Sequence, residues 1–205
     1  NADLVARSLA GDGGAFGQSV AGVGDPLGNG HAAFLVGSPG HAGADSDEGA
    51  VFVFRWGLLG VEPTPWSSLS CPGPCNGGSF GSSAALIGDL GDDGYPDFAI
   101  GAPAYDAGAA AEGNVFVYAA TASGLSGVPT MTLDNPANTA FAYFGAALAP
   151  TGRFGAFGQL GVSVGAPRQA GEGVVEGAAF LYAGVAALVP TPVTIAAPDA
   201  DPLGG

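Results

Sequence analysis

The sequence predicts an all-β fold of three consecutive four-stranded antiparallel blades of the β-propeller type, either open or completed by neighbouring copies. Three observations support this prediction. A repeat of fixed length runs through the chain, short apolar strands alternate with turn residues, and no segment keeps a helical period. The 38 glycines among 205 residues suit the sharp turns and close strand approach that such blades need.

Three independent landmarks recur 64 residues apart and define the repeat. A Phe-Gly pair stands at 16, 80 and 144, a Gly-Ser-Pro or Gly-Ala-Pro triplet at 37, 101 and 165, and a Glu-Gly pair at 48, 112 and 176. Such agreement in one register is very improbable by chance. The repeat divides the chain into an extra outer strand of a preceding blade (1–14) and three units (15–78, 79–142 and 143–205).

Each unit is expected to contain four short strands. In the second unit these are 80–87, 97–103, 113–120 and 128–133, separated by turns rich in Gly, Asp and Pro. The second strand is almost wholly apolar and the third is β-branched and aromatic. Both are therefore expected to be buried on two faces, between neighbouring blades.

The first and third units repeat this pattern, with third strands at 51–56 and 178–183 and fourth strands at 64–70 and 191–198. The segment 2–10 also aligns with the fourth strand. Each of the three units already has its own fourth strand, so this segment is expected to pair with a blade outside them. Two interpretations follow: the chain is cut from a longer array, or copies join head to tail by donating this strand to a neighbour's edge.

Composition excludes some classes of function. Lysine is absent, and four arginines face 18 acidic residues, which gives a net charge of −14. Such a chain repels nucleic acid and favours cations such as calcium. Charged residues make up only 11%, which predicts contact with other copies or partners, and no apolar run is long enough to predict a membrane-spanning helix.

The two cysteines lie in the run Cys71-Pro-Gly-Pro-Cys75. A redox Cys-x-x-Cys motif needs two intervening residues, whereas this run has three. A zinc site would need further ligands, and His31 and His41 are distant in sequence. We therefore expect a disulfide that closes a tight loop, which implies an oxidising compartment.

The repeated residues resemble the FG-GAP repeat family, found in integrin α-subunit propellers and many bacterial surface proteins. The resemblance rests on the Phe-Gly pairs, the acidic loop, the Gly-Ala-Pro triplets and the Gly-x-Val-Phe-Val-Tyr strand, and it covers the whole chain. It implies four-stranded blades, Ca²⁺ on the blade loops, an extracellular or cell-surface location, and adhesion or ligand binding. It identifies no ligand, because one fold hosts many functions.

The loop between the first two strands of the second unit is close to the family's calcium loop. Its candidate metal residues are Asp89, Gly91, Asp93, Tyr95 and Asp97. The expected ligands are the three carboxylates and the Tyr95 carbonyl, because calcium takes about six to eight oxygens and a short loop can wrap them round one ion. Gly91 departs from the family, which has Asp or Asn there; Asp92 or a water molecule would fill the place.

The other two units carry weaker versions of this loop. The first keeps Asp25 and Asn29 but has lost the carboxylate that corresponds to Asp97, so we expect weak metal binding or none. The third has no carboxylate at the aligned positions and is expected to bind no metal. These positions hold Arg153, Gly155, Phe157 and Gly161.

The sequence favours binding or assembly over catalysis. Two histidines, no lysine and no Gly-x-Ser-x-Gly elbow leave few general bases or activated nucleophiles, so we expect no enzyme. The leading hypothesis is an extracellular calcium-binding adhesive or structural module, including the subunit of a self-assembling surface filament. The alternative is a propeller fragment of a larger receptor or secreted hydrolase that binds a protein or glycan ligand. Four aromatic residues are candidates for sugar stacking, although core packing is favoured for them: Trp56, Trp66, Tyr105 and Tyr143.

Overall fold

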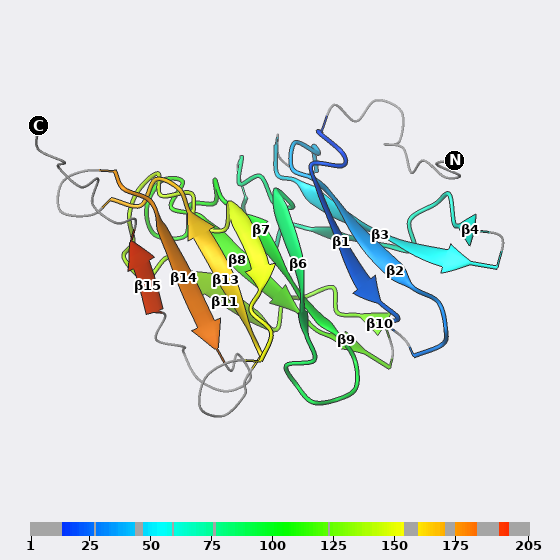
Figure 1. Ribbon diagram of the computed structural model, residues 1–205. Coiled ribbons are helices and arrows are strands. Elements are labelled where there is room, and N and C mark those ends of the chain that lie inside the picture. The colour runs from blue at the N-terminus through cyan, green and yellow to red at the C-terminus, as the bar shows by residue number, and fades with distance from the viewer. Residues whose placement is uncertain are drawn as a thin grey trace, which may run out of the picture.

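The computed structural model describes residues 14–26, 28–43, 47–58, 60–75, 77–122, 124–153, 160–170, 175–183 and 193–196. Within these ranges the chain is all-β, without a helix. Its main strands form three antiparallel sheets that lie side by side in chain order (Figure 1). The predicted set of three four-stranded blades is confirmed. The described part contains no helix long and apolar enough to cross a membrane.

The first blade has the strand order β1-β2-β3-β5, and the short strand β4 pairs with the end of β3. Its strands are β1 (Ser19–Gly24), β2 (Ala33–Ser38), β3 (Ala50–Gly57), β4 (Gly60–Val61) and β5 (Ser67–Ser70).

The second blade has the order β6-β7-β8-β11, with a small separate hairpin, β9-β10, between its third and fourth strands. Its strands are β6 (Ser83–Gly88), β7 (Asp97–Ala102), β8 (Asn114–Tyr118), β9 (Ala120–Thr121), β10 (Gly124–Leu125) and β11 (Met131–Asp134).

The third blade has the order β12-β13-β14-β15. Its strands are β12 (Ala147–Pro150), β13 (Gly161–Ala166), β14 (Ala178–Ala183) and β15 (Val193–Ala196). The predicted strand 178–183 matches β14 residue for residue. The extra strand predicted at 2–10 lies outside the described residues.

Three features differ from the predicted strands. The fourth strands expected at 64–70 and 128–133 begin later, at Ser67 and Met131. The strand expected at 80–87 begins only at Ser83, because Phe80 instead forms an isolated parallel bridge with Gly49 of the preceding blade. The extension at β4 and the hairpin β9-β10 were not predicted, because two-residue strands carry no readable alternation.

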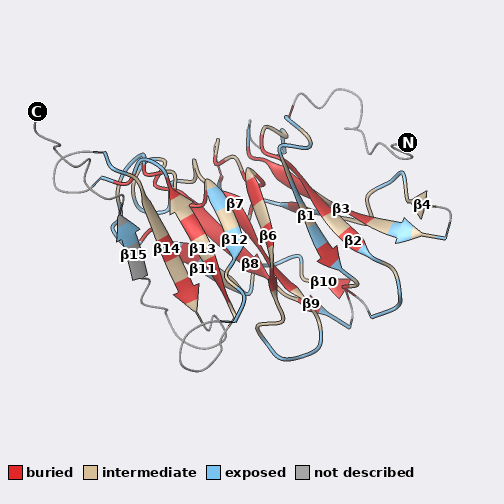
Figure 2. Ribbon diagram, viewed as in Figure 1, coloured by how far each residue is buried: buried red, intermediate tan, exposed pale blue. Residues whose placement is uncertain are grey.

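The core consists of two apolar clusters, one in each space between neighbouring blades. The central strands β7 and β8 are buried along their whole length, as expected for strands covered on both faces (Figure 2). In the third blade, β12 and β14 are partly or largely exposed, because a neighbouring blade covers only one face of that sheet.

Each space between blades is filled in the same way. The later blade contributes an aromatic face, which in the second blade contains Phe80, Phe98 and Phe116. The earlier blade contributes an aliphatic face, which in the first blade contains Leu35 and Val53. The cluster between the second and third blades repeats this arrangement 64 positions later, with Phe144 and Phe180 on the aromatic side, facing Ala99 and Val117.

Hydrogen bonds also join the blades at repeated positions. Ser19 Oγ donates to the Gly81 carbonyl at 2.7 Å, and Ser83 Oγ donates to the Gly145 carbonyl at 2.6 Å. These contacts require glycine opposite the serine, since a Cβ at Gly101 would collide with the Gly145 carbonyl oxygen. The blades are thus held together by a repeated polar contact as well as by apolar burial.

Cys71 and Cys75 form the expected disulfide. Both are buried and belong to the cluster between the first and second blades. The crosslink therefore fixes the turn that leads from β5 into the second blade.

Candidate metal centre

The acidic loop at 89–97 connects β6 to β7 in the second blade. Gly88 ends β6 at a register irregularity with φ of 92°, a left-handed conformation that favours glycine. The loop therefore leaves the sheet sharply, and it returns at Asp97, the first residue of β7.

Asp89 organises the loop by accepting hydrogen bonds from its backbone. Its Oδ1 accepts from the Asp93 amide at 3.0 Å and its Oδ2 accepts from the Gly94 amide at 2.7 Å. Asp93 Oδ1 in turn accepts from the Tyr95 amide at 2.9 Å, and Gly94 provides the tight turn with φ of 88°. Short acidic side chains therefore fold the loop by bonding to nearby amides, as Asx turns do.

Asp97 is the buried carboxylate of the group, with 6% of its surface exposed. Its Oδ2 accepts from the Leu90 amide at 2.7 Å. The pKa of Asp97 is raised to about 6, chiefly by burial; the Leu90 and Gly91 amides oppose the rise, and the charges of Asp93 and Asp89 add to it. At neutral pH the loop thus holds a buried negative charge near two others, a situation that a bound cation relieves.

The predicted metal residues converge only in part. Gly91, Asp93 and Asp97 line one pocket of about 210 Å³, and residues of the β8 and β11 region line its other side. Asp89 and Tyr95 do not line it. No group of three or more His, Cys, Asp or Glu side chains in the described ranges is arranged to hold a metal ion. The donor set nevertheless suits calcium chemically, because every candidate ligand is an oxygen.

The first blade folds its degenerate loop in the same way. Asp25 accepts from the Asn29 and Gly30 amides at 3.1 and 2.5 Å, and Asn29 Oδ1 accepts from the His31 amide at 3.1 Å. Ala33 stands in place of Asp97, so the buried carboxylate is missing. Asp25 and Asn29 therefore hold the turn through the same contacts that Asp89 and Asp93 make in the second blade.

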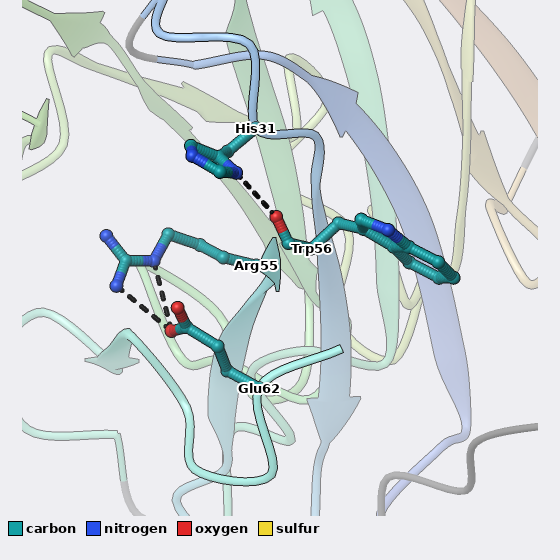
Figure 3. Close-up of polar contacts among 4 residues, drawn as sticks. All are labelled: His31, Arg55, Trp56 and Glu62. Atoms are coloured by element: carbon teal, nitrogen blue, oxygen red, sulfur yellow. Dashed lines mark hydrogen bonds and ion pairs between the residues drawn. The ribbon is translucent and has the colours of Figure 1, made fainter. Parts of the chain in front are cut away.

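A separate set of contacts holds the edge of this first loop. The His31 ring lies 2.8 Å, through Nδ1, from the Trp56 carbonyl at the end of β3 (Figure 3). Arg55 forms an ion pair at 3.0 Å with Glu62 beyond β4, and its guanidinium also lies over the Trp66 ring. The Trp56 indole points away from these contacts and is 56% exposed.

In the third unit, Arg153 and Gly161 are described, and Gly155 and Phe157 lie outside the described residues. Arg153 follows β12, and Gly161 begins β13.

One structural role was missed from the sequence. Glu112 served only as a landmark of the repeat, yet its carboxylate is 1% exposed and accepts from the Gly108 and Ala109 amides at 2.7 and 3.1 Å. Glu48, at the same register in the first blade, is also buried. The recurrence of this glutamate ahead of each third strand was the available signal that the Glu112 carboxylate holds the preceding turn.

Comparisons with known proteins agree with the repeat. The model of the FG-GAP repeat matches residues 80–118. Integrin alpha-IIb of Mus musculus is 37% identical over 126 residues, which cover 59% of this chain and 12% of that protein. Integrin alpha-PS5 of Drosophila melanogaster is 35% identical over 162 residues, which cover 74% of this chain and 15% of that protein. The matched region thus spans only a small part of the length of these relatives.

Proposed function

The chain is an FG-GAP repeat protein similar to integrin α subunits, and from this premise we propose that it is an extracellular, non-catalytic module of the adhesion type. The observation that carries the proposal is that the three sheets recur along the chain with the same 64-residue spacing as the repeat. The family likeness supports a cell-surface or extracellular location, and the disulfide suits an oxidising compartment.

We further propose that the loop at 89–97 binds one calcium ion. Asp93 and Asp97 supply carboxylates to one pocket, and Asp89 keeps the loop in shape through its two amide contacts. Such an ion would neutralise the buried charge of Asp97 and fasten the loop to the start of β7. The proposed role is structural, because the lining side chains other than these two carboxylates are apolar or uncharged.

Thermal unfolding with and without calcium tests this site. We expect calcium to raise the Tm of the wild-type chain, since a ligand that binds only the folded state adds about 2.7 kcal/mol at a hundredfold excess over Kd. Asp93→Asn should abolish most of that shift. Asp47→Asn, a change at an exposed carboxylate outside the loop, is the matched control and should respond to calcium as the wild type does. An equal calcium response from all three proteins would reject the site.

A protein or glycan ligand is the alternative for the binding role, as part of a larger receptor or secreted hydrolase. The observation in its favour is Trp56, whose indole is more than half exposed at the end of β3. Trp66 and Tyr105 instead pack against the core, which favours a structural role for both.

We also propose that the module associates with adjacent repeat blades; the filament of identical copies expected from the sequence would form only if the end faces of its first and third blades match. The first and third blades support this proposal, because each has one sheet face that no described blade covers. Whether copies can join head to tail depends on how well those two end faces match.

A further inference from the structure

The two interfaces within the chain show what this type of blade accepts as a neighbour. In both, an aromatic face meets an aliphatic face, and a serine of the earlier blade donates to the glycine carbonyl of the later blade's Phe-Gly pair. The serine-to-glycine hydrogen bonds of the two interfaces are 64 residues apart, so both interfaces follow one pattern of pairing.

The first blade presents the aromatic half of this pairing without a described partner. Its Phe16, Phe34 and Phe52 are partly exposed, whereas the equivalent Phe80, Phe98 and Phe116 of the second blade are at most 3% exposed. We call the set Phe16, Val20, Phe34 and Phe52 the open aromatic face.

The open aromatic face already has the arrangement found in the covered interface. Phe16 packs against Phe52 and Phe54, as Phe80 packs against Phe116 and Tyr118. Val20 is 68% exposed, and the equivalent Ala84 and Leu148 pack into the two interfaces. The first blade therefore needs no rearrangement to receive a neighbour.

The outward face of the third blade lacks part of the aliphatic, serine-bearing surface that an aromatic face packs against. The interblade hydroxyl is gone and two aliphatic positions have become polar, so this face lacks both the donor and part of the apolar surface that the rule requires. At three equivalent positions the first, second and third blades carry, in that order, Ser19, Ser83 and Ala147; Val23, Ile87 and Thr151; and Leu35, Ala99 and Ser163.

We infer that the open aromatic face is a docking surface for a repeat blade that presents branched aliphatic side chains and a serine hydroxyl, and that the third blade of a second copy is not that partner. This inference rests on the proposed association with other repeats and is independent of the proposed calcium site. The two end faces then differ: the first blade accepts such a blade, and the third blade lacks the serine hydroxyl and part of the aliphatic surface needed to act as one.

A variant that restores the outward face of the third blade tests the inference. Ala147→Ser, Thr151→Ile and Ser163→Ala together reproduce the residues of the second blade at surface positions. Gly165 still occupies the place of Gly101, so the backbone leaves room for a neighbour. We expect the wild-type chain to stay monomeric in light scattering, and the restored variant to show at least about a twofold higher mass that rises with concentration.

The open aromatic face is tested by adding Val20→Glu to the restored variant, which should return the mass to that of a monomer. Val128→Glu, at a residue 70% exposed before β11, is the matched control and should leave the oligomers intact. A restored variant that stays monomeric overturns the inference. So does a wild-type chain that associates as strongly as the restored variant, or oligomers that Val20→Glu does not affect. The same light-scattering measurements are repeated with chelator. If only the calcium proposal is wrong, the masses are the same with and without chelator.

Discussion

At the scale of single residues, Asp97 combines two roles that oppose each other. Its carboxylate accepts the Leu90 amide and so closes the loop on β7, but its burial beside Asp93 and Asp89 disfavours the charged form. The carboxylate that shapes the loop is therefore the one that destabilises it when no cation is bound.

This conflict predicts a pH dependence of stability in the presence of chelator. The pKa of Asp97 is raised from 3.8 to about 6 in the folded state, so the folded chain binds this proton more tightly than the unfolded chain. The contribution is present in full below pH 3.8 and is lost as the pH rises through about 6. Urea unfolding should show the free energy of unfolding of the wild type falling over that window relative to Asp97→Asn. Parallel pH profiles for the two proteins would contradict the assignment.

Glycine shows at residue scale how the repeat constrains the chain. Gly101 faces the Gly145 carbonyl and the Ser83 hydroxyl of the interface. The nearest atom to a Cβ added at the equivalent Gly165 is the Ala147 methyl, at 3.4 Å. The same sequence position is thus essential within the array and dispensable at its end.

We therefore predict that Gly101→Ala lowers the free energy of unfolding by about 1–3 kcal/mol, the usual cost of overpacking. Gly165→Ala is the matched control and should change it by less than about 1 kcal/mol. Urea denaturation of the two variants measures both effects. Equal losses would mean that an unobserved neighbour also crowds Gly165, or that interface packing does not limit Gly101.

At the scale of elements, the main strands were predictable because each carries a regular pattern bounded by Gly, Pro or Asp. The strand at 178–183 was predicted to the residue, since its aromatic and aliphatic alternation is uninterrupted. The first strand of the second unit was predicted too long, because Phe80 packs between the blades and bridges to Gly49 instead of joining the strand ladder. Periodicity alone cannot separate those two uses of an apolar side chain.

The candidate site was predictable to a smaller extent. Spacing located the acidic loop, and the structure puts Gly91, Asp93 and Asp97 on one pocket. Spacing could not reveal that both oxygens of Asp89 engage the loop's own amides, because a carboxylate at a turn serves a metal or the backbone with the same sequence pattern. The first loop is an example: Asp25 accepts the same two amide hydrogen bonds, although that loop has no carboxylate equivalent to Asp97.

At the scale of the whole molecule, the described blades are joined at the interfaces between neighbours. Each apolar cluster joins two consecutive blades, and the interblade hydrogen bonds do the same. Stability in such an array is approximately the sum of the blades and their interfaces, so a blade with two interfaces is expected to open less often than a blade with one.

Hydrogen exchange should therefore be slowest in the central blade. The amides of β7 and β8 are expected to exchange more slowly than those of β13 and β14, which have the same pairing and the equivalent sequence register but one uncovered face. Mass spectrometry of peptides from the two blades gives the comparison within one sample, and the matched strands control for hydrogen-bond geometry. Equal protection would mean that the blades open only together, so that burial by a second neighbour adds no local stability. In the restored variant, oligomer formation should raise protection in β13 and β14 toward that of β7 and β8, because the third blade then gains its second interface.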